Sequence, residues 1–584
     1  MSVASISTRR VAGRADAASA AARAGAHLDL VRAPFTLPRS RILILRDGDR
    51  LRVHTSEYER SLEECVALDA LEVCDSDGAP MPITRVLPHV IEFGGEVTLT
   101  FAGTTAWSVG VRSGNGTEAL VRWTRRAGEE PEELRIGGWH AASVVFSLDG
   151  SRAISATPSD RHEEHLAATR QVWLDWFANC PAVRPDLQDM TAFCWWVLGA
   201  NIVELPRLGD ARAVVPSKIG YVGLWQWDAY FIAVGLRHGD PELAREQLDL
   251  ALRFPTPEGQ LPDVVHEQGV LASSDDLPAS DRATLRRAGS AVADPTTPVP
   301  LTKPPLAAWA LRKVLEVDGD ADTGAGEWAR RMIATIRRSQ DWWFAHSDLD
   351  GDGLPEYGHP YSSGLDDSPV FDGALPTTTP DLAAYLIRQD LDLAALVERW
   401  GADSDPDRDR AAAASAHRER AHRTLERLLT TLWDEPSGRF RSLAAGEPVH
   451  SDTVVGLMPL LTGELPGVIV DGLVEALDDP HRFATPWPIP TVAVADPDHA
   501  SQRMWRGPVW VNTNALVAEG LERSGHPEQA RRLAERTVEL VIHAGGPHEY
   551  FDPNTGERAA SATTAFGWSA ALFIDLAVAL SQVD

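Results

Sequence analysis

Hydrophobic and polar residues follow two different patterns along the chain, and the change between them comes near residue 160. From about Leu37 to Ser155, short runs alternate between apolar and polar residues and end at turns rich in Gly and Asp. Such runs, spaced about ten residues apart, are typical of the strands of an antiparallel sandwich. The pattern therefore predicts a β-sandwich domain over residues 36–158.

Beyond residue 165 the apolar residues recur at intervals of three and four, which is the spacing of helices with one buried face. We predict a helical domain over residues 159–584, with about a dozen helices joined by loops rich in Gly, Pro and Asp. The clearest helical ranges are Leu166–Phe177, Met190–Val203, Leu243–Phe254, Leu306–Val317, Trp328–Phe344, Leu382–Trp400, Ala411–Trp433, Val509–Leu521 and Ala530–Ile542.

The first residues, 1–35, are rich in Ala and Arg, and we expect a flexible tail there. This stretch contains no apolar core of the kind that a signal peptide needs. Later segments lack a run of about 18 apolar residues that would span a membrane. We therefore expect a cytoplasmic protein. The formal net charge of −29 disfavours nucleic acid and anionic membranes as partners.

Two carboxylates in loops rich in Gly and aromatic residues are the strongest candidates for chemistry. Asp366 lies in Tyr361-Ser-Ser-Gly-Leu-Asp-Asp-Ser-Pro369, and Glu549 lies in Gly545-Gly-Pro-His-Glu-Tyr-Phe-Asp-Pro553. Cleavage of a glycosidic bond needs such a pair, because one acid protonates the leaving oxygen while a carboxylate activates water. Aromatic side chains around them suit the apolar faces of a sugar ring.

The helical part carries five short signatures in a fixed order. They are Gly223-Leu-Trp-Gln-Trp-Asp-Ala-Tyr-Phe231, Thr302-Lys-Pro-Pro-Leu-Ala-Ala-Trp309, the Asp366 loop, Trp505-Arg-Gly-Pro-Val-Trp-Val-Asn-Thr-Asn514 and the Glu549 segment. Together they resemble glycoside hydrolase family 63 and its trehalase-like relatives over roughly residues 165–584. Within that group the chain looks most similar to small bacterial enzymes that hydrolyse mannosylglycerate or glucosylglycerate.

The resemblance implies a mainly α fold, an (α/α)6 barrel that follows the N-terminal antiparallel β-sandwich and holds the active site at the mouth of its inner ring of helices. It implies that Asp366 is the general acid and Glu549 the general base of an inverting α-glycosidase. The neighbouring Asp367 is the alternative acid. The expected substrate is a small α-glucoside or α-mannoside, such as glucosylglycerate, mannosylglycerate or a disaccharide, and no cofactor is expected.

The same signatures supply candidate residues for binding the substrate. Asp228, between aromatic residues, can accept hydrogen bonds from sugar hydroxyls; the alternative is an aspartate that caps a helix. Arg506 can bind hydroxyls or a substrate carboxylate, or it forms a structural ion pair, and Lys303 is a weaker candidate. The predicted substrate-binding residues are Trp225, Gln226, Trp227, Asp228, Tyr361, Gly364, Arg506, Gly507, Trp510 and Trp568.

Two further stretches of the sequence are a possible metal-binding loop and a possible lid. Asp348-Leu-Asp-Gly-Asp-Gly353 begins like an EF-hand, but His359 stands where the loop needs its glutamate, which excludes an EF-hand. Some relatives in the family hold calcium in this loop, so that alternative stays open; we interpret the loop as a tight turn and predict no metal site. Residues 273–300, rich in Ser, Asp, Ala and Pro, are predicted to form a lid or an insertion.

Three alternatives belong to other functional classes. A phosphorylase would carry a basic phosphate site in place of Glu549, and an epimerase of this shape would rely on histidines. A carbohydrate-binding protein without catalysis needs neither carboxylate, so the presence of Asp366 and Glu549 weighs against it. A small glycoside is the expected partner, and an oligomer is possible.

Overall fold

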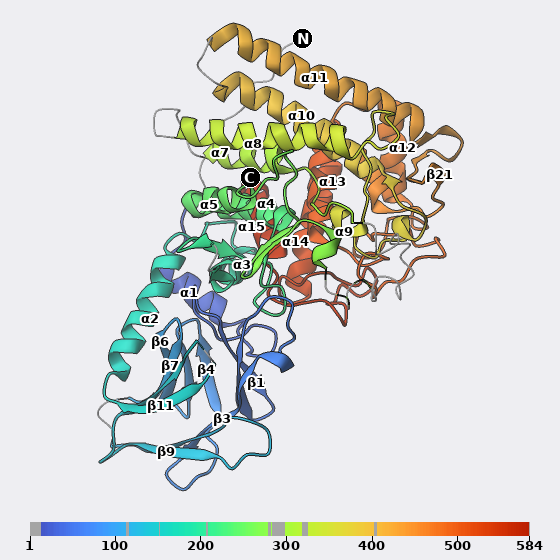
Figure 1. The fold of residues 1–584 in the computed structure, drawn as a ribbon. Coiled ribbons are helices and arrows are strands. Elements are labelled where there is room, and N and C mark those ends of the chain that lie inside the picture. Colours follow the sequence, from blue (N-terminus) through green and yellow to red (C-terminus); the bar gives the residue numbers. More distant parts are fainter. Residues whose placement is uncertain are drawn as a thin grey trace.

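The computed structural model describes residues 13–112, 116–150, 152–205, 208–277, 279, 282, 298–317, 325–401 and 406–582. Two β-sheets form one end of the molecule and the helices form the rest (Figure 1). Most of the segment predicted as a lid, residues 273–300, lies outside the described residues, as do residues 1–12 of the predicted tail.

The N-terminal strands are β1 Ile42–Asp47, β2 Arg50–Thr55, β3 Val66–Asp75, β4 Ile83–Leu87, β5 Val90–Phe93, β6 Val97–Gly103, β7 Ala106–Val111, β8 Glu118–Thr124, β9 Glu132–Gly137, β10 Ser143–Leu148 and β11 Ile154–Ser159. One sheet has the order β1-β2-β3-β8-β9 and the other the order β11-β10-β7-β6-β5-β4. Neighbouring strands are antiparallel in both. The predicted antiparallel sheet region is therefore confirmed.

The two sheets enclose a shared apolar core. Trp123 of β8 packs edge-on against Phe146 of β10, which belongs to the other sheet, with ring centroids 5.1 Å apart. Trp107 of β7 stacks on the same phenyl ring at 5.2 Å. All three rings are at most 4% exposed. The contact of Trp123 with Phe146 thus links the two sheets, and Trp107 packs on the same ring from within its own sheet.

The longer helices are α1 Ala17–Gly25, α2 His162–Phe177, α3 Gln188–Ala200, α4 Gln226–Leu236, α5 Pro241–Ala251, α7 Ala307–Val317, α8 Ala325–His346, α10 Pro380–Trp400, α11 Pro406–Thr431, α12 Gly467–Asp478, α13 Val511–Arg523, α14 Pro527–His543 and α15 Gly567–Ser581. Each helix predicted from the apolar spacing overlaps one of these. The rest of the helices, α1, α4, α12 and α15, were not among the clearest predicted ranges.

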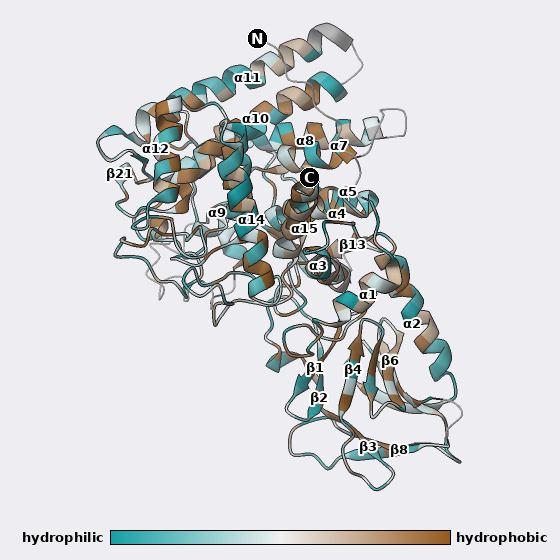
Figure 2. Ribbon diagram, turned by 180° about the vertical axis from the view of Figure 1, so that it is seen from behind, coloured by the Kyte–Doolittle hydropathy of each residue, from teal (hydrophilic) through white to brown (hydrophobic). Residues whose placement is uncertain are grey.

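Helices differ in how much of their surface they bury. All residues of α4 are buried, and α3 and α15 are buried on nearly every side. By contrast, α5 and α14 bury only a stripe of residues at three- and four-residue spacing. Figure 2 shows α15 as a hydrophobic helix among the others, whereas hydrophilic residues dominate α11 at the outer edge. A helix that is hydrophobic all round lies in the core of the fold.

Short elements connect the helices and carry much of the candidate site. The short strands are β12 Ile202–Glu204, β13 Arg212–Val214, β14 Leu224–Trp225, β15 Val264–His266, β16 Gly269–Leu271, β17 Thr377–Thr378, β18 Trp433–Asp434, β19 Arg439–Phe440, β20 Leu443–Ala444 and β21 Glu447–Pro448. The short helical turns are η1 Glu63–Cys65, η3 Ser274–Asp276, α9 Pro360–Ser363, η4 Pro369–Phe371, η5 Glu435–Ser437 and η6 Val454–Thr462.

The predicted tail is wrong from Ala17 onward, because the chain forms helix α1 there. The side chain of Asp16 caps it by accepting a hydrogen bond from the amide of Ser19 at 2.8 Å. Ala20 and Ala24 are fully buried, and α1 packs against α2 and α3. Alanine favours helices strongly, and its small side chain allows close packing, so a stretch of low complexity still has a packed structure.

Hydrogen bonds and an ion pair join the sheets to the helical part. The side chain of Lys218 is buried and donates to the backbone carbonyl of Leu37 at 3.0 Å. Ser56, just after β2, donates its hydroxyl to the carbonyl of Lys218 at 2.7 Å. Arg41 pairs with Glu267 in the turn between β15 and β16, at 2.7 Å. The end of β2 is therefore fixed against the loop that precedes α4, and the start of β1 is fixed against the turn between β15 and β16.

Candidate active site

Asp366 lies in the loop that follows α9, and the position of this loop depends on Gly364. Gly364 ends α9 in the left-handed conformation, with φ 72°. A Cβ atom on Gly364 would lie 2.2 Å from Cζ2 of Trp227, so any side chain here collides with the indole. The glycine thus permits both the turn and the close approach to Trp227, and it holds Asp366 beside the start of α4.

The two neighbouring aspartates have different surroundings. Asp367 accepts a hydrogen bond from the amide of Trp505 at 2.8 Å and pairs with Arg503 at 3.1 Å. Oδ1 of Asp366 is shielded from solvent and has no hydrogen-bond partner among the described residues. Burial raises the pKa of Asp366 to about 6, although nearby Lys303 opposes the rise. Burial raises the pKa of Asp367 as well, so the two aspartates differ mainly in their bonds: Asp367 is held by Trp505 and Arg503, whereas Oδ1 of Asp366 is left without a protein partner within the described residues.

Glu549 is buried in the segment between α14 and α15. Its Oε2 accepts a hydrogen bond from the amide of Thr563 at 2.9 Å, and its own amide donates to the carbonyl of Thr563 at 2.9 Å. The hydroxyl of Tyr221 also hydrogen-bonds the carboxyl group. Burial raises the pKa of Glu549 to about 7, the bonds to Thr563 and Tyr221 oppose this, and Asp366 raises it further. The charge of Asp366 therefore acts on the protonation of Glu549.

The first turn of α4 lies beside these two carboxyl groups. Gln226, Trp227 and Asp228 are each at most 5% exposed. The pKa of Asp228 is raised well above its usual value by burial, and the charges of Asp263 and Glu549 add to this while Lys303 opposes it. Nε2 of Gln226 has no hydrogen-bond partner within the described residues. Asp228 lies inside the helix rather than at its cap, because the capping position is Trp225.

Lys303 and Asp263 form a buried pair at the centre of this cluster. Nζ of Lys303 lies 2.8 Å from Oδ1 of Asp263 and donates to the carbonyl of Tyr361 at 2.6 Å. Burial alone would lower the pKa of Lys303, but the charges of Asp263, Asp366 and Asp228 raise it. The ammonium group is therefore held among protein carboxylates, where it partly offsets their mutual repulsion.

Arg506 is buried and forms an ion pair with Asp372. Its Nε atom is shielded from solvent and lacks a hydrogen-bond partner among the described residues. Gly507 donates its amide to the hydroxyl of Thr491 at 2.8 Å, and a Cβ atom there would lie 2.8 Å from the carbonyl oxygen of Ala500. This loop therefore packs too tightly at Gly507 for a side chain.

Three of the predicted aromatic residues, Trp227, Trp510 and Trp568, form one packed cluster. Trp227 meets Trp568 edge-on, with ring centroids 5.4 Å apart. Trp510 stacks on Trp505 at 3.7 Å and on Tyr550 at 4.8 Å, and its indole nitrogen donates to the carbonyl of Met504 at 2.8 Å. Trp510 is thus fully engaged by protein groups. Nε1 of Trp568 has no hydrogen-bond partner in the described part of the chain.

Sequence reasoning missed two residues of this cluster, Tyr221 and Asp263. Ionised Glu549 and burial raise the pKa of Tyr221 well above its usual value, and Asp366 adds to the rise. Asp263 holds Lys303. Tyr361, which was predicted, lies on the outer side and packs against Val264, Leu271, Leu277 and Leu301 together with Trp225. Neither missed residue belongs to a quoted signature, although Tyr221 lies two residues before the first one.

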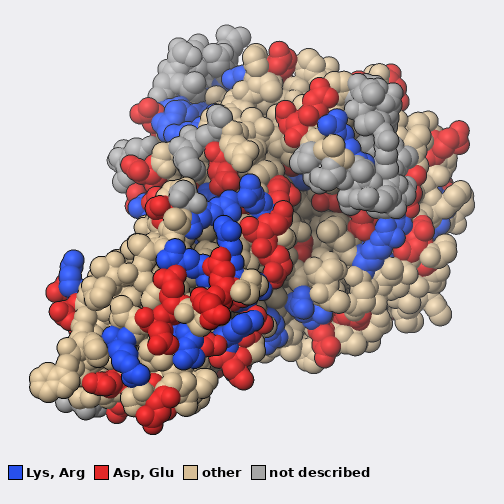
Figure 3. Space-filling view, turned by 60° about the horizontal axis from the view of Figure 1, so that its bottom comes forward, with Lys and Arg blue, Asp and Glu red and all other residues tan. Residues whose placement is uncertain are grey.

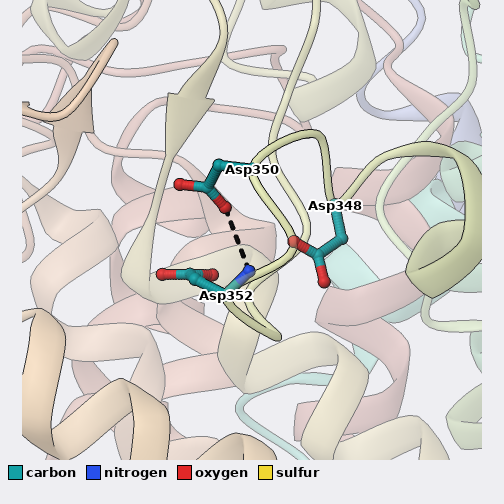
Figure 4. A group of neighbouring side chains, drawn as sticks. All are labelled: Asp348, Asp350 and Asp352. Atoms are coloured by element: carbon teal, nitrogen blue, oxygen red, sulfur yellow. Dashed lines mark hydrogen bonds between the residues drawn. The ribbon is translucent and has the colours of Figure 1, made fainter.

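The acidic loop between α8 and α9 is a separate feature. Asp348, Asp350 and Asp352 each offer a carboxylate oxygen, and these atoms lie within 4.8 Å of one another. Figure 4 shows the three side chains around one tight turn. Each carboxylate accepts a hydrogen bond from a backbone amide of the same loop, from Gly353, Asp352 and Leu354 respectively, at 2.8–3.2 Å. This geometry agrees with a turn stabilised by its own aspartates.

Acidic and basic residues alternate on the described part of the face in Figure 3 rather than gathering by sign. This distribution agrees with the net charge in disfavouring a polyanionic partner. Within the described residues, no helix is both long and apolar enough to cross a membrane.

Comparison with known proteins identifies the family. The profile of the mannosylglycerate hydrolase MGH1-like glycoside hydrolase domain matches residues 221–569, which is more than half of the chain. The chain belongs to this family. It is therefore a glycoside hydrolase, and the predicted resemblance to family 63 and the trehalase-like enzymes is confirmed.

Named relatives of this glycoside hydrolase come from bacteria and a plant. Mannosylglycerate hydrolase from Thermus thermophilus is 30% identical, over 63% of this chain and 97% of its own length. Mannosylglycerate hydrolase MGH1 from Selaginella moellendorffii is 27% identical, over 61% of this chain and 80% of its own. Glucosylglycerate hydrolase from Mycolicibacterium hassiacum is 25% identical, over 65% and 97%.

Solved structures agree with the sequence relatives. A mannosylglycerate hydrolase of Thermus thermophilus, in complex with Tris and D-glycerate, has a TM-score of 0.53 at 27% identity, covering 65% of this chain and 98% of that one. Neutral trehalase from Saccharomyces cerevisiae has a TM-score of 0.50 at 17% identity, covering 65% and 78%. The second similarity concerns the fold alone.

Proposed function

We propose that this glycoside hydrolase is an inverting α-glycosidase that cleaves a small α-glucoside or α-mannoside, with Asp366 as general acid and Glu549 as general base. One observation carries the proposal. The two carboxyl groups come from distant loops, yet Glu549 is buried, Oδ1 of Asp366 is shielded from solvent, and Asp366 acts electrostatically on Glu549. Groups with raised pKa values that meet beside buried aromatic rings are typical of a catalytic site.

Protonated Asp366 would give its proton to the glycosidic oxygen as the bond to the anomeric carbon breaks. Ionised Glu549 would take a proton from a water molecule that attacks the opposite face of the sugar. The amide of Thr563 and the hydroxyl of Tyr221 hold the carboxylate of Glu549 in place. Inversion requires room for the water, so we expect the two carboxyl groups to lie about 6.5–9.5 Å apart.

The sugar to be cleaved would lie against α4. Asp228 and Gln226 would bind its hydroxyl groups, and the orphaned Nε2 of Gln226 would gain a partner. Trp227 and Trp568 would pack against the apolar face of the sugar ring. Trp510 would pack on the side of Trp568 away from the sugar. Buried polar atoms normally have partners, so unpaired atoms beside a catalytic pair favour a polar ligand.

Several relatives are named as hydrolases of mannosylglycerate or glucosylglycerate, and one solved relative was crystallised with D-glycerate. We infer that a glycosyl-acid is the leading substrate class for this chain as well. Arg506 is the candidate for the substrate carboxylate, because its Nε lacks a partner within the described residues. Lys303 is not, since it is already held by Asp263 and Tyr361.

Three finer structural predictions remain part of this proposal. The alternation of wholly buried helices such as α4 and α15 with striped ones such as α5 and α14 supports an (α/α)6 barrel. The domain boundary at residue 158 and the cytoplasmic location stay predictions.

The test is a hydrolysis screen with trehalose, glucosylglycerate, mannosylglycerate, kojibiose, nigerose and maltose, followed by NMR of the sugar released. Cleavage of a small α-glycoside with the β-anomer as first product supports the proposal. Release of the α-anomer would contradict inversion, and cleavage that depends on phosphate would indicate a phosphorylase instead.

A further inference from the structure

The partly exposed aromatic residues near the site come from both parts of the chain. Trp225 precedes α4, Tyr221 precedes β14, Tyr361 belongs to α9, and His266 ends β15. All are half-buried, in contrast to Trp227, Asp228 and Glu549 beneath them, which are at most 5% exposed. The fifth residue of this aromatic rim, Tyr58, comes from the N-terminal sheets, in the loop between β2 and η1.

Tyr58 is in direct contact with two other residues of the rim, His266 and Trp225. Its ring stacks on His266 with centroids 4.2 Å apart and planes 6° apart, and it meets Trp225 at 5.9 Å. The absence of a side chain at Gly223 makes room for it, because a Cβ atom there would lie 3.2 Å from Cε2 of Tyr58. Tyr58, Trp225 and Tyr361 pack on the same small apolar cluster. The loop of Tyr58 and helix α9, which precedes the loop of the candidate acid, therefore pack on one apolar cluster.

The backbone fixes Tyr58 in this position. The next residue, Glu59, adopts a positive φ of 53°, a conformation that costs free energy for a non-glycine residue and persists only where contacts hold it. Ser56 is bonded to Lys218, and Arg41 donates to the carbonyl of Ser56 at 3.0 Å. The carboxylate of Glu59 also contributes to the raised pKa of Tyr221. The loop thus reaches the surroundings of Glu549 as well as those of Asp366.

The arrangement separates two regions of the site. If the sugar to be cleaved lies on the buried floor, beside Asp228 and the two carboxyl groups, its leaving group must point outward. The outward direction is the aromatic rim. Aromatic side chains bind the apolar faces of hydroxyl-bearing carbon chains while their polar edges bind hydroxyls.

We propose that the rim formed by Tyr58, Tyr221, Trp225, His266 and Tyr361 binds the leaving group of the substrate, and that Tyr58 of the N-terminal sheets is a specificity-determining residue. This inference rests on the proposed glycosidase function. The match to the family begins only at Tyr221, so Tyr58 lies outside the part of the chain that the family shares. The N-terminal sheets would then complete the substrate site rather than serve stability alone.

The test compares two substrates that share a sugar but differ in the leaving group. One is the best glycoside found in the hydrolysis screen, and the other is the corresponding α-glycosyl fluoride, whose leaving group is too small to reach the rim. In the full-length chain, Tyr58→Ala should lower kcat/KM about tenfold more for the glycoside than for the fluoride, mainly through KM. Tyr58→Phe keeps the ring and should stay within about twofold of the parent on both.

Trp139→Ala is the matched control, because Trp139 is an aromatic residue in the turn after β9 that is 99% exposed and far along the chain from β2. It should change neither rate. If Tyr58→Ala does not fold, as judged by circular dichroism, Tyr58→Leu keeps the apolar volume and should show the same selective loss.

The results distinguish a wrong role for the aromatic rim from a wrong activity for the enzyme. Equal losses on the two substrates would mean that Tyr58 only holds the parts of the chain together, and no loss would mean that the rim does not bind the leaving group. Either result overturns the inference while leaving the glycosidase intact. A parent enzyme that cleaves neither substrate overturns the proposed function, and the inference falls with it.

Discussion

Nζ of Lys303 lies 2.8 Å from Oδ1 of Asp263, and the two charges of this buried pair act on the pKa of Asp366 with opposite signs. Lys303 lowers that pKa and Asp263 raises it. If Asp366 is the general acid, the pair sets the pH range in which the acid keeps its proton.

Lys303→Met and Asp263→Asn should therefore move the pH optimum of kcat/KM in opposite directions. Loss of the positive charge raises the pKa of Asp366 and shifts the optimum upward, and loss of the negative charge shifts it downward. The measurement is kcat/KM against pH for both variants and the parent. Shifts of the same sign would show that the pair acts through packing and not through its charges.

The parent enzyme should have a narrow, bell-shaped pH profile with its optimum between about 6 and 7. The active form needs Asp366 protonated and Glu549 ionised. Because Asp366 has the lower pKa of the two, this form is a minor population that is largest between the two values; it falls at lower pH as Glu549 gains a proton and at higher pH as Asp366 loses its own. The two groups interact, so the limbs report the pair rather than single residues. A flat profile from pH 5 to 9 would contradict the assignment.

Gly364→Ala should destabilise the fold more than Gly351→Ala does. Both glycines have nearly the same positive φ, 72° and 73°, so the backbone cost is matched. A Cβ atom at Gly364 meets the ring of Trp227 at 2.2 Å, whereas at Gly351 it meets nothing within 4 Å. Overpacking of this kind costs about 1–3 kcal/mol. The difference between the unfolding free energies of the two variants, measured in urea, gives the cost of the contact between the added Cβ atom and Trp227.

The collision at Gly364 also displaces the Asp366 loop, so Gly364→Ala should lose activity while Gly351→Ala keeps it. Equal stability and activity of the two variants would show that the loop does not depend on its contact with Trp227.

Helical spacing was enough to predict most of the long helices, because each amphipathic helix carries its own pattern. The same reasoning fails at α1, because the Ala-rich sequence predicts a flexible tail although Ala20 and Ala24 are fully buried. Alternation likewise predicted the N-terminal strands but not their order. β3 pairs with β8 because the intervening strands β4 to β7 belong to the other sheet, a long-range choice that local pattern does not encode.

The candidate site shows the same limit. Asp366 and Glu549 were recognised from signatures, whereas their proximity to Lys303 and Asp228 emerges only from the fold. Tyr221 and Asp263 were missed because a single residue in a loop gains its role from a partner elsewhere, Glu549 for one and Lys303 for the other. Sugar binding by Trp510 stays a prediction; its stacking on Trp505 and Tyr550 is a long-range contact that the sequence pattern does not encode.

Arg506→Ala should raise KM for a glycosyl-acid substrate about ten- to a hundredfold, because a hydrogen bond to a charged group contributes about 1.5–3 kcal/mol. KM for a neutral disaccharide should change much less. Arg506→Lys keeps the charge and serves as the control, although it loses the planar geometry. The same increase on both substrates would mean that the ion pair with Asp372 serves the fold rather than the substrate.

The central claim is that Asp366 donates the proton and Glu549 activates the water, and one experiment tests both roles. Asp366→Asn and Glu549→Gln are each assayed on the glycoside and on its α-glycosyl fluoride, whose departure needs no proton. Both variants should lose about 10²–10⁴-fold on the glycoside. Asp366→Asn should keep much of the parent rate on the fluoride, whereas Glu549→Gln should lose it. An Asp366→Asn variant that is equally impaired on both substrates, or a Glu549→Gln variant that cleaves the glycoside at the parent rate, would contradict the account.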